Sequence, residues 1–185
     1  DKKDAASADP AKTKNEIKVG TTPGYSEQVV EFVAKEAEKE GLKVTIVPFS
    51  DYVTPNQALA QGDTDLNSFQ HGPFLNAFNE KNGTHIVAIG NTYLAPLRLF
   101  SNKYKSVNDL PDGASIAIPN DPSNGGRALL LLEKNGLIKL KEGTDPVKAV
   151  ISDIAENPKH LNLIELEAPQ LPRALEDCDG SVING

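Results

Sequence analysis

The chain has 185 residues, 38% of them hydrophobic, so it is long enough to bury a core and to form one large or two small α/β domains. Its 26 acidic and 19 basic residues give a formal charge of −7, which argues against nucleic acid or an anionic membrane surface as the main partner. A single cysteine excludes an internal disulfide, and no apolar run approaches the roughly 20 residues that span a bilayer. Small molecules and proteins remain as partners.

Residues 1–16 are mostly Lys, Asp, Ala, Ser and Thr without apolar periodicity, which predicts a flexible tether. From residue 17 onward, short apolar strands alternate with amphipathic helical segments, which is typical of α/β folds with mainly parallel sheets. The first series predicts strands at 17–21, 42–46, 65–69 and 86–89. Helices are expected between them, at about 25–40, 54–61 and 73–81.

The extended segment 91–100 contains Pro96 and fits a crossover or an edge strand better than a central strand. A second series follows it, with strands expected at 115–118, 161–166 and 181–183, and helices at 124–134, 146–155 and 170–177. We therefore predict a tether over 1–16, a first lobe over 17–93 and a second lobe over 94–185.

Residues 118–127, of sequence IPNDPSNGGR, lead from a strand through small polar residues into an apolar helix. Free N–H groups and the positive end of the helix dipole favour an anion at such a start, and Arg127 could hold a carboxylate through two hydrogen bonds. The absence of Gly-Lys-Ser/Thr excludes a nucleotide P-loop. The alternative is that Gly125 and Gly126 only permit tight packing while Arg127 faces solvent.

Residues 69–74, of sequence FQHGPF, follow a predicted parallel strand, and ligands bind at the carboxyl ends of such strands. Two phenyl rings and one imidazole suit an apolar side chain with a polar end. A bland alternative is that His71 only begins a helix and that the rings belong to the core. The three histidines show no metal-ligand spacing and no Gly-x-Ser-x-Gly is present, so we expect no enzyme, no metal and no cofactor.

With these segments in view, residues 17–185 resemble the NlpA-type (MetQ-like) methionine-binding lipoprotein family. The stretches that carry the resemblance are Asp51 to Val53 with Pro55-Asn56, Gly62-Asp63, Asn67 to His71, Gly90 to Thr92, Pro119 to Asn124, Arg127 with its leucine run, Leu166 to Arg173, and Val182 to Asn184. The family fold that this implies is the two-lobed, type 2-like periplasmic-binding architecture, with an amino acid held in the cleft between two α/β lobes.

The resemblance implies seven ligand-binding residues: Tyr52, Phe69, His71, Phe74, Asn120, Arg127 and Asn184. The first four would surround the ligand from the first lobe. Arg127 would bind its carboxylate, and the two asparagines would add polar contacts from the second lobe. Phe74 stands where a tyrosine is expected, so only ring packing is implied there.

The implied function is capture of L-methionine for an ABC importer, with the permease and ATPase as partners. The resemblance also implies a lipid anchor upstream of the polar leader, an extracytoplasmic location at the membrane, and a C-terminal return to the first lobe that this sequence lacks. Three alternatives stay open: another apolar amino acid or a methionine-containing dipeptide as ligand, a surface adhesin or antigen, and an enzyme on the same fold.

Overall fold

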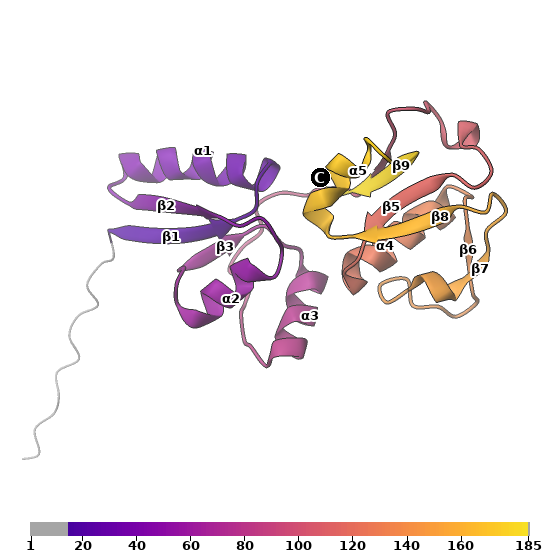
Figure 1. Cartoon of the computed structure of the whole chain (residues 1–185). Coiled ribbons are helices and arrows are strands. Elements are labelled where there is room, and N and C mark those ends of the chain that lie inside the picture. Colours follow the sequence, from indigo (N-terminus) through magenta and orange to yellow (C-terminus); the bar gives the residue numbers. More distant parts are fainter. Residues whose placement is uncertain (1–14, 185) are drawn as a thin grey trace, which may run out of the picture.

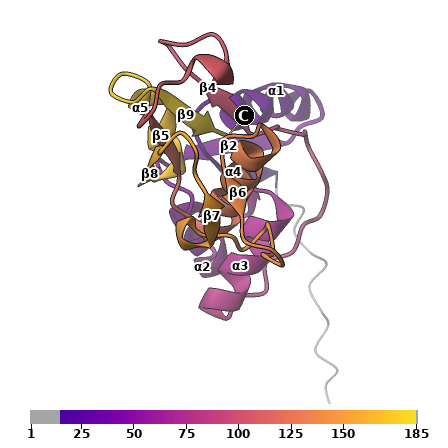
Figure 2. The same cartoon turned by 90° about the vertical axis from the view of Figure 1, so that its right-hand side faces the viewer.

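The computed structural model describes residues 15–184, which form two α/β lobes side by side (Figure 1). Each lobe is built on its own sheet, and a long connecting segment runs between the two sheets. Seen from the side of the second lobe (Figure 2), the first lobe lies behind it. The two-lobed α/β fold expected from the sequence is thus confirmed. Among residues 15–184, no helix has the length and apolar character needed to cross a bilayer.

The first sheet has the order β2-β1-β3 and is entirely parallel. Its strands are β1 (Glu16–Thr21), β2 (Lys43–Pro48) and β3 (Leu66–Ser68). The strands predicted at 17–21, 42–46 and 65–69 are confirmed within two residues at each end. Strand β1 begins at Glu16, the last residue of the predicted tether, and residues 1–14 of that tether lie outside the described residues.

Helices α1 (Tyr25–Lys39), α2 (Thr54–Gln61) and α3 (Gly72–Asn82) complete the first lobe. Figure 1 shows α1 along one face of the sheet and α2 on the other side. Pro55 in the first turn of α2 and Gly62 in a left-handed conformation at its end match the signals that predicted this helix. Helix α1 buries Val30, whereas Val33 on the same helix is 52% exposed.

The second sheet has the order β4-β9-β5-β8. Its strands are β4 (Arg98–Phe100), β5 (Ser115–Pro119), β8 (Asn162–Leu166) and β9 (Gly180–Ile183). Strand β5 is parallel to β8 and β9, while β4 is the antiparallel edge strand. The edge position of β4 agrees with the expectation drawn from Pro96. Helices α4 (Pro122–Lys134) and α5 (Leu171–Ala174) accompany this sheet, and 3-10 turns cover 107–109, 151–153 and 168–170.

The core of the second lobe forms because β5 presents alternate side chains to opposite faces. Ile116 and Ile118 pack with Leu129 and Leu132 of α4, and all four are at most 1% exposed. Ala117 faces the other way, into a smaller cluster with Leu171 of α5. Strand β5 is therefore buried on both faces, which fixes the position of the loop that follows it.

Two predicted elements are wrong. Residues 86–89 are not a strand, because residues 84–97 contain neither helix nor strand, and Val87 and Ile89 are 73% and 80% exposed. Residues 146–155 are not one helix either. They form turns, and strand β7 (Ile154–Glu156) pairs with β6 (Lys139–Leu140) in a small antiparallel sheet. In both cases tertiary pairing decides the outcome, which local apolar patterns do not encode.

Candidate ligand-binding cleft

The candidate site lies where strands of both sheets end. Strand β3 ends at Ser68 and leads through Phe69 and Gln70 to His71, while β5 ends at Pro119 and leads to Asp121 and α4. Strand β9, parallel to β5, ends at Ile183, beside Asn184. The carboxyl ends of parallel strands are where open α/β sheets bind ligands. The segments that follow β3 and β5 meet across the lobes, since α3 contacts α4 and His71 is hydrogen-bonded to Asn124.

Three hydrogen-bond donors converge on one oxygen, the Oδ1 of Asn124. Nε2 of His71 lies 2.7 Å from it, NH1 of Arg127 donates over 3.0 Å, and Nδ2 of Asn184 donates over 3.1 Å. The side chain of Asn124 is in turn held by the carboxylate of Asp121. We call these five residues the cleft cluster. A guanidinium, an imidazole N–H and an amide NH₂ pointing at one acceptor form a donor set suited to a carboxylate.

The tautomer of His71 follows from its two partners. His71 is the N-cap of α3, and its Nδ1 accepts a hydrogen bond of 3.2 Å from the backbone N–H of Phe74. Nδ1 is therefore unprotonated, so Nε2 carries the hydrogen and donates it to Asn124. Burial is the main cause that lowers the pKa of His71 below its ordinary 6.5, and the charge of Arg127 acts the same way; the hydrogen bond to Asn124 and the charge of Asp121 oppose them.

An aromatic group lies beside the cleft cluster. The ring centre of Tyr52 lies 5.9 Å from that of Phe69 and 6.0 Å from that of Phe74. The ring centres of Phe69 and Phe74 are 6.2 Å apart. Tyr52 also packs against the smaller core cluster of the second lobe. Burial raises the pKa of Tyr52 to about 12, with Asp121 and Tyr93 adding to the rise, so the phenol is neutral. This group offers an apolar surface next to the polar donors.

Not all sequence-predicted residues occupy equivalent places. His71, Arg127 and Asn184 meet in the cleft cluster, and Tyr52, Phe69 and Phe74 form the aromatic group. Asn120 is exposed, its backbone N–H donates to the carbonyl of Leu166 over 2.8 Å, and its side chain is not among the three donors to Asn124 Oδ1. Asn124 takes the central position. Asn124 ends the segment 119–124 that carries the resemblance but was not among the seven predicted ligand-binding residues; the N-cap signal of Asp121 could have located it in the first turn of α4.

The oxygen of the Asn184 side chain is an acceptor without a donor. Its Oδ1 is buried and has no hydrogen-bond partner among residues 15–184, while its Nδ2 bonds to Asn124. Burying such an atom costs folding free energy unless a donor is supplied.

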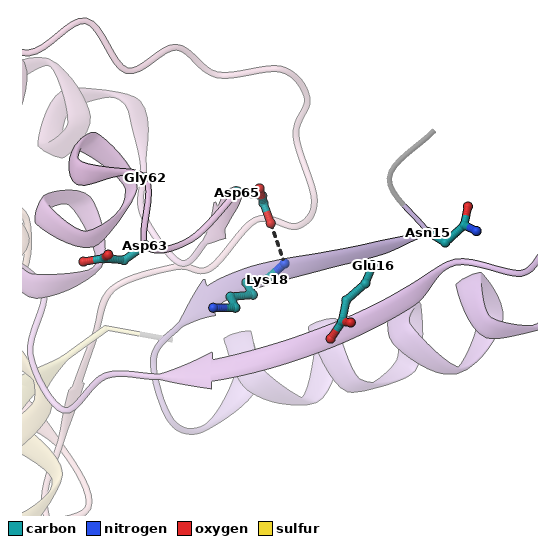
Figure 3. Close-up of a pocket in the computed structure, with 6 residues that line it drawn as sticks. All are labelled: Asn15, Glu16, Lys18, Gly62, Asp63 and Asp65. Carbon is teal, nitrogen blue, oxygen red and sulfur yellow. Dashed lines mark hydrogen bonds between the residues drawn. The ribbon is translucent and has the colours of Figure 1, made fainter. Parts of the chain in front are cut away.

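A depression of about 430 Å³ lies away from this cluster, beside the start of β1, and is lined by Lys18, Asp63 and Asp65 among others (Figure 3). Within residues 15–184, no three His, Cys, Asp or Glu side chains gather in a way that could hold a metal ion.

The fold is a two-lobed α/β architecture whose candidate site lies where the lobes meet. The family model of the NlpA lipoproteins matches residues 17–185, and the chain belongs to this family. It is 52% identical over 168 residues to the D-methionine-binding lipoprotein MetQ of Escherichia coli K12, covering 90% of this chain and 62% of that protein. It is 49% identical to the probable D-methionine-binding lipoprotein MetQ of Haemophilus influenzae, and the match covers 100% of this chain and 66% of that protein.

Among solved structures, the chain resembles a nutrient-binding protein from Burkholderia cenocepacia that was determined bound to methionine. The TM-score is 0.85 at 53% sequence identity, and the match covers 91% of this chain and 71% of that one. The chain spans about 62% of the length of the E. coli relative described above.

Proposed function

We propose that this chain captures methionine in the cleft between its lobes and serves as the substrate-binding lipoprotein of an ABC importer. The observation that carries the proposal is the convergence of His71, Arg127 and Asn184 on one oxygen, directly beside an aromatic group. Methionine has a carboxylate for the donors and a flexible thioether for the rings. The relatives support this ligand, because the E. coli protein is named for D-methionine binding and the Burkholderia cenocepacia protein was determined bound to methionine.

In this proposal each end of the amino acid has its own partner. Arg127 binds the carboxylate, displacing part of its present bond to Asn124. The unpaired Oδ1 of Asn184 accepts a hydrogen bond from the ammonium group, which removes the cost of burying that oxygen alone. The thioether lies against Tyr52, Phe69 and Phe74, where sulfur and ring contacts are favourable. No group in this scheme acts as a nucleophile or a base, so the ligand is released unchanged and we propose no enzymatic activity.

We further propose that closure of the lobes around methionine creates the form that docks on the permease and ATPase, and that a lipid anchor holds the protein at the outer side of the membrane. Differential affinity of the ligand for the closed arrangement is the physical requirement for this step. The family description as lipoprotein supports the anchor and the extracytoplasmic location.

Native mass spectrometry of the purified protein, followed by titration calorimetry with both enantiomers of methionine, tests the proposal. We expect methionine either to be retained through purification or to bind on addition. Arg127→Ala should weaken binding by roughly 100-fold or more, because it removes a charged partner of a desolvated carboxylate. Arg173→Ala, at an exposed position in α5, is the matched control and should bind normally. Equal affinities of the two variants would refute the assignment of Arg127, and another amino acid binding more tightly than methionine would replace the proposed ligand.

A further inference from the structure

Asp121 makes two kinds of contact at the start of α4. As the N-cap, its Oδ2 accepts hydrogen bonds from the backbone N–H of Asn124 over 3.0 Å and from Oγ of Ser123 over 2.9 Å. In addition, the side-chain Nδ2 of Asn124 lies 3.0 Å from both carboxylate oxygens. The first kind of contact is ordinary helix capping, which Asn or Ser would supply equally well. In the second kind, the carboxylate can act only as the acceptor.

The second contact determines which way the Asn124 amide faces. A carboxylate has no hydrogen to donate, so it can pair only with the NH₂ end of the amide. The Oδ1 end must then face His71, Arg127 and Asn184, all of which are donors. A half-turn of the amide would set oxygen against carboxylate at one end and NH₂ against three donors at the other. Both ends of Asn124 would lose their bonds.

We infer that Asp121 is a positioning residue: its carboxylate fixes the orientation of Asn124, and through Asn124 Oδ1 it holds the donors of His71 and Arg127 in place for the ligand. Asp121 does not itself suit the ligand carboxylate, since the two charges would repel. Its charge also acts on His71 directly, but its hydrogen-bonded path to the cleft cluster runs through Asn124. The consequence for ligand affinity rests on the proposed function, while the consequence for the geometry of the cleft cluster does not.

Asp121→Asn separates the two contacts. The new amide still caps the helix through its oxygen, so we expect the thermal midpoint to change little. The new side chain has one oxygen and one NH₂ group in place of two oxygens, so it can pair with either end of the Asn124 amide. The Oδ1 of Asn124 is then no longer held toward His71. We expect the ¹⁵N resonances of the His71 ring to shift, and methionine affinity to fall roughly 10- to 100-fold, the value of a hydrogen bond to a charged group. Asp145→Asn is the control, because Asp145 likewise accepts from a backbone N–H, of Val147, but lies outside the cleft cluster.

A double-substitution cycle excludes a merely structural effect. If Asp121 acts mainly through Asn124, then Asp121→Asn should shift the His71 ring resonances much less in a protein that already carries Asn124→Ala, where only the loss of the Asp121 charge remains. If Asp121→Asn fails to fold, Asp121→Ser keeps a capping oxygen and serves instead. The inference is overturned if the His71 resonances of the Asp121→Asn variant match those of the unsubstituted protein. That spectrum decides the matter even if the unsubstituted protein does not bind methionine, an outcome that would refute the proposed function alone.

Discussion

Nε2 of His71 lies 2.7 Å from Oδ1 of Asn124, and this hydrogen bond joins the start of α3 in the first lobe to the first turn of α4 in the second. Both nitrogens of the ring are engaged, because Nδ1 accepts from the backbone of Phe74. One neutral side chain thus caps a helix and links the lobes at the same time. Protonating Nδ1 would remove the cap acceptor.

The protein should become less stable as the pH falls below about 6.5. The pKa of His71 is lowered in the folded state, so between its folded and unfolded pKa values the unfolded chain binds more protons. The stability that neutral His71 contributes is complete above 6.5 and is lost as the pH falls through the lowered folded pKa. Urea unfolding at about pH 8 and about pH 5 measures the loss. His71→Gln, which cannot protonate, should show a smaller drop between these two conditions; an equal drop would assign the pH dependence to other groups.

Gly126→Ala should destabilise the protein by roughly 1–3 kcal/mol. A Cβ at this position would lie 2.5 Å from the carbonyl oxygen of Pro146 and 2.9 Å from that of Val147, and backbone atoms cannot move aside cheaply. Because Arg127 is the next residue, the shift in α4 should also weaken methionine binding. Gly72→Ala in α3 is the control, since a Cβ there meets nothing within 4 Å. If the two variants had the same unfolding midpoint, that result would contradict the close packing of α4 on the 146–147 turn.

Asp179→Asn should cost about 1–2 kcal/mol of unfolding free energy. Its Oδ2 accepts from the backbone N–H of Ser115 over 2.9 Å, at the start of β5, and its Oδ1 accepts from Nζ of Lys103 over 3.2 Å. The hydrogen bond from the Ser115 backbone is the main cause that lowers the pKa of Asp179 below 3.8, with Lys103 adding to it. The contribution is therefore present above 3.8 and is lost as the pH falls through the lowered value. Asp177→Asn, at an exposed site, is the comparison in denaturant titration, and a similar loss there would remove the special role of Asp179.

Phe74→Ala should weaken methionine binding by roughly tenfold or more, because it removes one of the three rings proposed to contact the thioether. Phe32→Ala is the matched control, as Phe32 is 65% exposed on α1. Calorimetry with alanine as a second ligand separates side-chain contacts from general damage. Binding of alanine should change less than binding of methionine, and equal losses would show that the ring acts on the fold rather than on the ligand.

The sequence predicted helices and strands correctly where residues at their ends, such as Pro or Gly, mark the boundaries. Helix α2 has Pro55 and Gly62 at its ends, and β5 is an apolar run that is buried on both faces. Residues 86–89 have the same apolar character as β5, yet no strand lies beside them among residues 15–184. Whether such a run becomes a strand depends on a partner elsewhere in the chain, which its own residues do not reveal.

The cleft was predictable to a similar extent. Strand ends and the resemblance led to His71, Arg127 and the three rings, which the structure brings together across two lobes. The central position of Asn124 was not foreseen, because it depends on donors from residues 71 and 184, which are distant in sequence. In the sequence, Asn120 and Asn124 look alike, because both are asparagines in the same polar segment. Helix α4 begins at Pro122 rather than at the expected 124, which places Asn124 in the first helical turn, where its side chain reaches the other lobe.

Within residues 15–184, the chain passes from one sheet to the other once, through residues 84–97. Tyr93 anchors that passage to the first lobe, because its hydroxyl is hydrogen-bonded to Ser26 and its ring packs edge-on against Tyr25. His71 and Tyr52 also join the lobes, because their side chains reach from the first lobe to Asn124 and to the smaller core cluster of the second. We expect His71→Ala to broaden the distribution of interlobe distances in spin-label measurements, so that the same contacts that shape the cleft also keep its two halves in register.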